Sequence, residues 1–141
     1  MKKIRKLAAK RAGKAGQPPG TLHYPEEEIK EEIQINYIDY DEHNYQEKEV
    51  KDIAELAEIK ERNTVTWINV VGLSHLDKIS KLCNLFNIHP LIQEDIIHVH
   101  QRPKIEEHEN SLYIVLKMLN YNNELHEIDS EQVSIVVGDN Y

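Results

Sequence analysis

Cysteine is almost absent from this chain, and its scarcity limits how the fold can be held together. Cys83 is the only cysteine among 141 residues, so no disulfide can form within the chain, and the composition fits a reducing compartment. Apolar residues recur around Cys83 at helical spacing, which favours a buried thiol over a nucleophile. A chain of this length is one domain at most and is large enough to bury a hydrophobic core.

Long hydrophobic runs are missing as well. A membrane-spanning helix needs about 20 consecutive apolar residues, and the longest candidate, residues 112–119, is interrupted by Lys117. The basic amino terminus lacks the apolar centre of a signal peptide. There is also no glycine-rich phosphate loop and no serine or cysteine placed beside a base. The sequence therefore predicts no spanning segment in these residues and no enzyme.

Acidic residues are missing from the amino terminus, although they dominate the rest of the chain. Residues 1–16 carry a charge of +7 and the remainder carries −15, which gives the overall charge of −8. We expect a basic flexible arm over residues 1–20 and a folded domain over residues 21–141. The arm has no aromatic residues between its positive charges, so we expect no nucleic-acid partner. The acidic remainder should attract cations.

The hydrophobic pattern predicts helices alternating with strands, followed by a run of antiparallel strands. Strands are expected at residues 29–39, 64–70, 104–107, 112–120, 125–128 and 132–137. The strand at 64–70 is rich in β-branched residues and is predicted to be central in its sheet. Helices are expected at residues 47–61, after an N-cap and capping box at Ser74 and Asp77, and from Pro90 onward. Residues 40–47 are predicted to form a loop. The fold class is therefore α/β, with a mixed, partly antiparallel sheet flanked by helices.

Residues 88–104, with the sequence IHPLIQEDIIHVHQRPK, combine a short helix with several ligand-type side chains. Pro90 suits the first helical position, where the missing N–H has no cost, and His89 is placed to cap the helix. Arg102 precedes Pro103, which disfavours the α conformation, so the helix should stop before Gln101.

The polar side chains of this helix should gather on one side. At about 100° per residue, Glu94, Asp95 and His98 fall opposite Ile92 and Ile96, which should point to the core. One or two carboxylates can hold Mg²⁺, because this ion keeps several of its waters. A Zn²⁺ site would instead use Asp95 and His98 with a second imidazole from His100. A charged, solvated helix face without a metal is the third interpretation.

Five phrases of the sequence together resemble one protein family. They are GQPPGTLHY (16–24), TVTWINVVGL (64–73), FNIHPLIQEDIIHVHQRPKIE (86–106), LYIVLKML (112–119) and EQVSIVV (131–137). In this order and spacing they resemble the amino-terminal cytoplasmic domain of the CorA family of divalent-cation channels, above all its bacterial and archaeal Mg²⁺/Co²⁺ branch. The phrases are spread over most of the chain, so the resemblance is far more specific than any single motif.

The resemblance implies an architecture that the residues alone do not show. Family members are homopentamers in the inner membrane, and each subunit contributes two transmembrane helices to the pore. The domain on the cytoplasmic side is an α/β/α sandwich followed by a long helix, and a Gly-Met-Asn sequence forms the ion filter. We expect this chain to be a soluble piece of that domain, incomplete at its carboxyl end. The turn sequence at residues 138–140 also suggests a returning strand that is not part of the sequence.

The resemblance also implies a regulatory site and a function. Asp95 matches a carboxylate that binds Mg²⁺ between neighbouring subunits, and Glu94 matches a weaker contact. Bound metal would favour the closed pore, and the transported ions would be Mg²⁺ and Co²⁺, with Ni²⁺ as a further candidate. Two alternatives stay open. The chain could be a free-standing soluble metal-binding domain, or it could belong to the Zn²⁺-transporting branch, where His98 and His100 would suit softer ions.

Overall fold

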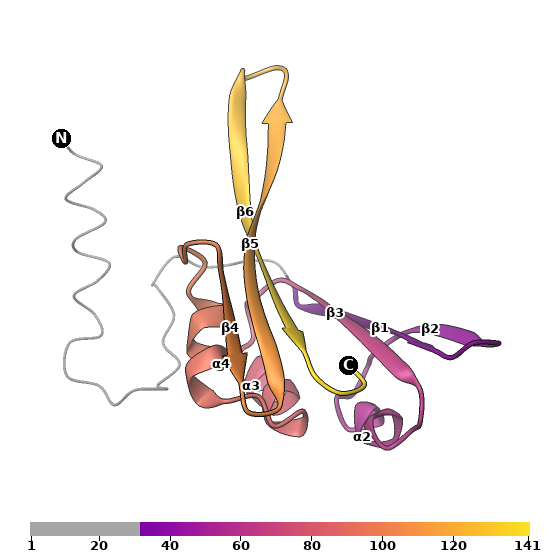
Figure 1. Cartoon of the computed structure of the whole chain (residues 1–141). Helices are drawn as coiled ribbons and strands as arrows, with labels where there is room; N and C mark the ends of the chain where they lie inside the picture. Colours follow the sequence, from indigo (N-terminus) through magenta and orange to yellow (C-terminus); the bar gives the residue numbers. More distant parts are fainter. Residues whose placement is uncertain (1–31) are drawn as a thin grey trace.

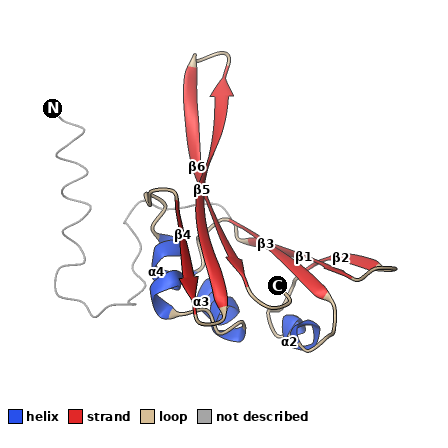
Figure 2. Ribbon diagram, in the orientation of Figure 1, coloured by secondary structure: helices blue, strands red, loops and turns tan. Residues whose placement is uncertain are grey.

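The strands described for residues 32–141 form two small antiparallel sheets, and helices pack on one face of each sheet (Figure 1). The computed structural model describes residues 32–141. The first sheet has the order β2-β1-β3 and the second has the order β4-β5-β6. The strands of the two sheets are β1 (Gln34–Tyr40), β2 (Tyr45–Glu49), β3 (Val65–Val71), β4 (Lys104–His108), β5 (Ser111–Asn122) and β6 (Glu127–Val137). The helices of the described residues are α2 (Glu55–Lys60), α3 (Leu76–Leu85) and α4 (Pro90–Ile97). The α/β fold class is confirmed (Figure 2).

Alternation along β1 builds the first core. Ile35, Tyr37 and Asp39 are buried, while the residues between them are more exposed, as expected when successive side chains point to opposite faces of a sheet. This confirms the predicted strand within the described residues. Its first part, residues 29–31, lies outside them. The buried members of this core are Ile35, Tyr37, Val50, Leu56, Ile59, Leu82 and Phe86.

Alternation along β5 builds the second core. Tyr113 and Val115 are fully buried and pack with Ile92 of α4. Ile88, in the loop before α4, packs against both cores, so it joins the two sheets. Beyond this core the β5–β6 pair continues as a ribbon that projects from the rest of the molecule (Figure 1).

Helix α4, within residues 88–104, has the predicted ends. Pro90 is its first residue, and the side chain of His89 caps it by accepting a hydrogen bond from the backbone N–H of Leu91 at 3.2 Å. The helix ends at Ile97, before Gln101. The buried thiol of Cys83 is also confirmed. Burial raises its pKa to about 11, which makes it a poor nucleophile.

Two predictions about the first sheet are wrong. Residues 45–49, of which 45–47 were predicted as loop and 48–49 as helix, form strand β2, whose side chains are all exposed and therefore carry no hydrophobic alternation. Strand β3 lies at the edge of the described sheet rather than at its centre, because β1 pairs with both β2 and β3.

Two predictions about helix boundaries are also wrong. The helix predicted over residues 47–61 is restricted to α2, because Asp52 directs a turn by accepting a hydrogen bond from the backbone N–H of Ala54 at 3.0 Å. Ser74 does not cap α3. The N-cap is His75 without a side-chain hydrogen bond, and the Ser74 hydroxyl has no hydrogen-bond partner within residues 32–141.

The last residues turn back toward the first sheet. After β6 the chain bends at Gly138, and the carbonyl of Asn140 accepts a hydrogen bond from the backbone N–H of Thr66 in β3 at 2.8 Å. The hydroxyl of Tyr141 donates to the carbonyl of Phe86 at 3.0 Å, and their rings lie 4.7 Å apart. These contacts fasten the carboxyl end to both α3 and β3.

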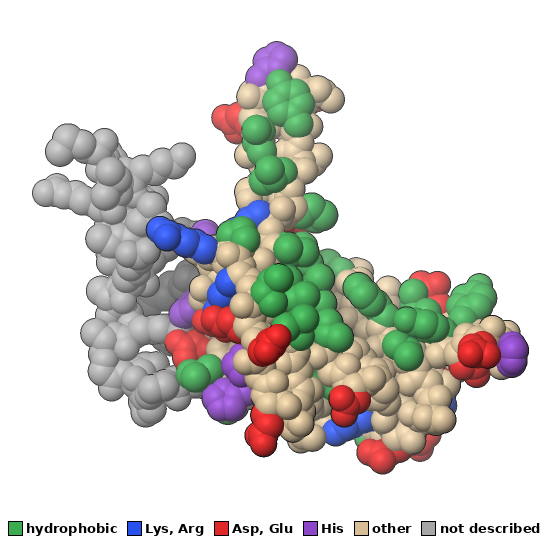
Figure 3. Space-filling model, viewed as in Figure 1, with side chains coloured by type: hydrophobic (Ala, Val, Ile, Leu, Met, Phe, Trp, Pro, Cys, Tyr) green, Lys and Arg blue, Asp and Glu red, His purple; other side chains and the backbone are tan. Residues whose placement is uncertain are grey.

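The outer face of each sheet is apolar and exposed (Figure 3). On the first sheet Trp67 pairs with Ile38 and is 58% exposed. On the second sheet Ile105 and Met118 are more than half exposed. Within residues 32–141 helices cover only the inner faces, so the second helical layer of an α/β/α sandwich is not among the described elements. No helix in that range is long and apolar enough to cross a membrane. The predicted arm, residues 1–20, lies outside the described residues.

Candidate cation-binding site at Asp95

Helix α4 and the loop after it hold Asp95 at the edge of the second sheet. Its side chain is 27% exposed, and Ile92, one turn earlier in the helix, packs against β5. The carboxylate is fully engaged within the chain. Oδ2 lies 2.6 Å from the ammonium of Lys104, and Oδ1 accepts a hydrogen bond from the side-chain amide of Gln101 at 2.8 Å.

Lys104 reaches Asp95 from strand β4. Lys104 pairs with the buried Val115 of β5, so its side chain projects from the same face of the sheet, the face on which α4 packs. The ammonium also donates to Glu106 at 2.8 Å and lies 5.4 Å from the centre of the Tyr113 ring. Burial by itself lowers the pKa of Lys104, but its hydrogen bonds and charge interactions with the two carboxylates outweigh burial and raise the pKa above its usual value. Lys104 is therefore a fixed positive charge between two acids.

Gln132 on β6 holds the loop that follows α4 and carries Gln101. Its side-chain carbonyl accepts a hydrogen bond from the backbone N–H of Gln101 at 2.9 Å. Lys117 on β5 donates to the carbonyl of Val99 in the same loop at 3.0 Å. The loop after α4 is thus held at Val99 and Gln101 by both neighbouring strands, whereas Asp95 itself stands in the helix.

The other predicted ligands lie near Asp95 in the chain but do not form a cluster with it. Glu94 and His98 are partly exposed, and each already has an interaction within the chain. His100 is exposed in the loop after α4. Within residues 32–141 no three His, Cys, Asp or Glu side chains are grouped closely enough to hold a metal ion. The metal roles of these residues therefore stay predictions.

Sequence reasoning missed the partners of Asp95. The strand predicted at residues 104–107 is present as β4. Lys104 pairs with the buried Val115 of β5, and this pairing places its side chain on the helix side of the sheet. Finding the Lys104–Asp95 ion pair from the sequence would have required the register between β4 and β5, which the hydrophobic pattern does not supply. The carboxylate oxygens are of the type that Mg²⁺ binds, but a cation at Oδ2 must share it with Lys104 or displace it.

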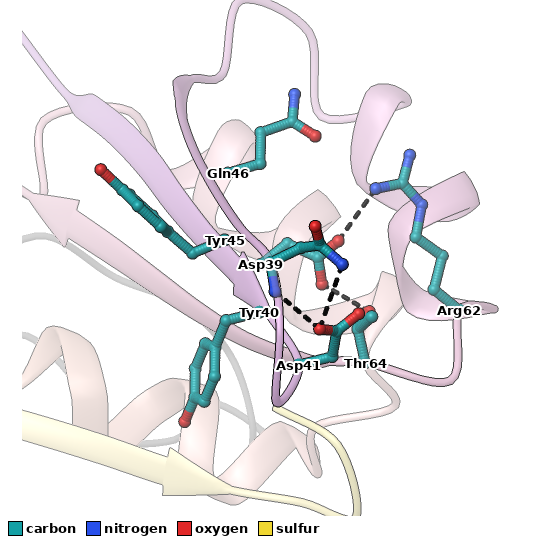
Figure 4. A pocket seen from close by; sticks show the side chains of 8 residues that line it. Asp39, Tyr40, Asp41, Tyr45, Gln46, Arg62 and Thr64 are labelled. Carbon is teal, nitrogen blue, oxygen red and sulfur yellow. Dashed lines mark hydrogen bonds and ion pairs between the residues drawn. The ribbon is translucent and has the colours of Figure 1, made fainter.

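A second polar cluster, also missed, lines a small hollow beside β1 (Figure 4). Asp39 is 6% exposed and accepts hydrogen bonds from Arg62 at 2.9 Å, from Thr64 at 2.5 Å and from Thr66 at 3.1 Å. Burial alone raises the pKa of Asp39, but the hydrogen bonds from Thr64, Arg62 and Thr66 together lower it below its usual value. With all these bonds made inside the chain, the cluster ties β1 to β3 and has the character of a structural network.

Comparison with known proteins gives a consistent result. Residues 62–141 match the family model described as CorA-like Mg²⁺ transporter protein. A curated relative from Thermotoga maritima, the cobalt/magnesium transport protein CorA, is 40% identical over 129 residues. The alignment covers 92% of this chain and 36% of the relative, so the chain spans about a third of the length of the curated relative that it matches.

Proposed function

Because the chain belongs to the CorA-like Mg²⁺ transporter family, we propose that it is part of the cytoplasmic Mg²⁺-sensing domain of a Mg²⁺/Co²⁺ channel and not an enzyme. The full-length protein is a homopentamer in the inner membrane, and its spanning helices lie in sequence beyond these residues. The observation that carries this proposal is the 40% identity to a cobalt/magnesium transport protein over 92% of the chain.

The sensing step is electrostatic. Asp95, with Glu94 beside it, faces the neighbouring subunit, and the facing carboxylates repel each other when no metal is bound. Mg²⁺ bridges the subunits when it is plentiful and favours the closed pore. When Mg²⁺ falls, the subunits separate and the pore conducts. An effector shifts such a balance only through its different affinity for the two states, typically by about 1–3 kcal/mol for each coupled site.

The need for ligands from a second subunit is consistent with the geometry. Asp95 is partly exposed at the edge of α4, and the described residues alone offer no group of three metal ligands. One or two carboxylates hold Mg²⁺ when waters and further oxygens complete its octahedron. His98 and His100 would add affinity for softer ions such as Co²⁺ or Ni²⁺.

Replacing Asp95 with alanine in the full-length channel tests the proposal. We expect Asp95→Ala to lose the resistance to proteolysis that Mg²⁺ gives the wild-type channel, because the bridging carboxylate is gone. Asp129→Ala is the matched control, since it removes an exposed carboxylate from the projecting ribbon. Cleavage is followed on gels across a Mg²⁺ series. Unchanged protection in Asp95→Ala would remove Asp95 from the sensor.

Calorimetric titration of Mg²⁺ into the 141-residue chain separates the channel domain from a free-standing metal-binding protein. A site shared between subunits and completed by other parts of the channel predicts weak binding by this chain alone. Tight binding that Asp95→Ala abolishes would favour the free-standing binder. The Zn²⁺-transporting alternative predicts instead that Zn²⁺ binds more tightly than Mg²⁺ and that His98→Ala or His100→Ala weakens it.

A further inference from the structure

A lysine ammonium lies against Asp95, the carboxylate that binds the bridging cation in the proposed function. The ammonium of Lys104 lies 2.6 Å from Oδ2 of Asp95 and 2.8 Å from Oε1 of Glu106. These are the distances of charge-assisted hydrogen bonds. The side chain is 25% exposed, so solvent can reach the pair, and an ion from solvent can approach the same carboxylate.

The lysine is held in place by the sheet and not by the carboxylate alone. Its backbone pairs with Val115 in β5, and its ammonium lies beside the ring of Tyr113. The remaining oxygen of Asp95 is occupied by Gln101. Both oxygens of Asp95 therefore have partners in the absence of metal, and the partner on Oδ2 carries a full positive charge.

We propose that Lys104 is a tethered cation that competes with Mg²⁺ for Asp95 and thereby sets the Mg²⁺ concentration at which the site fills. This inference rests on the proposed function, in which Asp95 is a metal ligand. A divalent ion at Oδ2 is repelled by the ammonium until the lysine side chain turns away. The second acid, Glu106, then retains Lys104 while Asp95 binds the metal.

The competition has a direct consequence for affinity. Removing the positive charge of Lys104 should tighten binding of a divalent ion at Asp95 by about tenfold, the lower end expected for one close charge pair that is partly exposed to solvent. Arginine at this position keeps the charge and should keep the weak binding. The lysine thus places the sensor in a range of higher Mg²⁺ than the bare carboxylate would give.

Lys117 supplies a matched control. It lies on the same face of the second sheet, two residues beyond Val115 in β5, and its ammonium donates to neutral oxygens of Val99 and Gln132. Lys117→Gln removes the same charge from the same side of the sheet without removing a partner of Asp95. A general change in electrostatic potential would affect both variants, whereas direct competition affects Lys104→Gln far more.

The experiment follows Mn²⁺ binding to the 141-residue chain by paramagnetic broadening of amide signals around Asp95, with Mg²⁺ added to displace Mn²⁺. Wild type, Lys104→Gln, Lys104→Arg, Lys117→Gln and Asp95→Asn are compared. We expect half-broadening in Lys104→Gln at about one tenth of the wild-type Mn²⁺ concentration, and little change in the arginine and Lys117 variants. Asp95→Asn should abolish the broadening.

Each outcome has a separate meaning. Broadening that persists in Asp95→Asn contradicts the proposed function. If Asp95 is required but Lys104→Gln binds like wild type, or like Lys117→Gln, the competition is wrong and the proposed function stands. Absence of binding in Lys104→Gln also overturns the competition. Should that variant not fold, the ¹⁵N signal of the Lys104 ammonium in the unmodified chain must change as Mg²⁺ is added, and a constant signal overturns the inference.

Discussion

Asp39 is a carboxylate enclosed by its own fold, and its hydrogen bonds define the first consequence at the scale of single residues. It is buried at 6% exposure and bonded to Arg62, Thr64 and Thr66. Because those bonds favour the ionised form, the pKa of Asp39 is below its usual value near 3.8. The carboxylate therefore contributes stability that is complete above the pKa of the unfolded chain and is lost as pH falls through the lower folded pKa.

We predict that Asp39→Asn lowers the free energy of unfolding by about 1–3 kcal/mol at pH 7, because Arg62 loses its anionic partner and faces an amide N–H donor in place of an accepting carboxylate oxygen. The Arg62 side chain is 43% exposed, so solvent screening keeps the loss within this range. Urea unfolding at pH 7 and at steps down to pH 3 measures it. The difference from wild type should shrink below about pH 4, and a constant difference would contradict the role of the charge. Asp129→Asn is the exposed control.

Single residues were predictable where their role depends on nearby sequence. The helix start at Pro90 and the cap at His89 were predictable because they involve only adjacent residues. His89 directly precedes Pro90, and its side chain bonds to the backbone of Leu91, two residues on. The lysine at Asp95 and the threonines at Asp39 come from strands whose register depends on the whole sheet. Sequence spacing cannot supply that register, so Asp95 was found without its partners and the Asp39 cluster was missed altogether.

At the scale of elements, α4 is held against the second sheet by a small number of buried side chains. Ile92 is 1% exposed and packs with Tyr113 and Val115, which are fully buried. This contact fixes the helix that carries Asp95. The stability of the element and the placement of the site therefore depend on the same residue.

Replacing Ile92 with alanine should lower the free energy of unfolding by about 2–5 kcal/mol, since the substitution leaves a cavity against β5. Leu91→Ala is the matched control, because Leu91 precedes it in α4 and is 47% exposed. Denaturant unfolding of both variants measures the difference. Equal losses in the two variants would mean that α4 is not anchored through Ile92.

Element type was predictable where burial alternates and failed where it does not. Strands β1 and β5 bury every second residue over part of their length, and both were found. Strand β2 buries none, so only its backbone pairing with β1 makes it a strand. In α2 the apolar pattern was correct, but Val50 reaches the same core from outside the helix, which made the predicted helix too long.

At the scale of the whole molecule, the described residues form a structure with one covered side and one open side. Helices pack on the inner faces of both sheets, and apolar residues remain exposed on the outer faces (Figure 3). The α/β class and the family followed from the sequence. The division into two antiparallel sheets did not, because it depends on which strands separated in sequence become neighbours.

The single tryptophan makes the open face observable. Trp67 is the only tryptophan in the chain, and its ring lies more than half exposed beside Ile38 on the outer side of β3. We predict long-wavelength emission that soluble quenchers such as iodide reduce strongly in this chain. If another polypeptide layer settles on that face, the emission should move to shorter wavelength and resist quenching. The emission of Trp67 therefore reports whether the outer face of the first sheet is exposed to solvent or covered by another polypeptide.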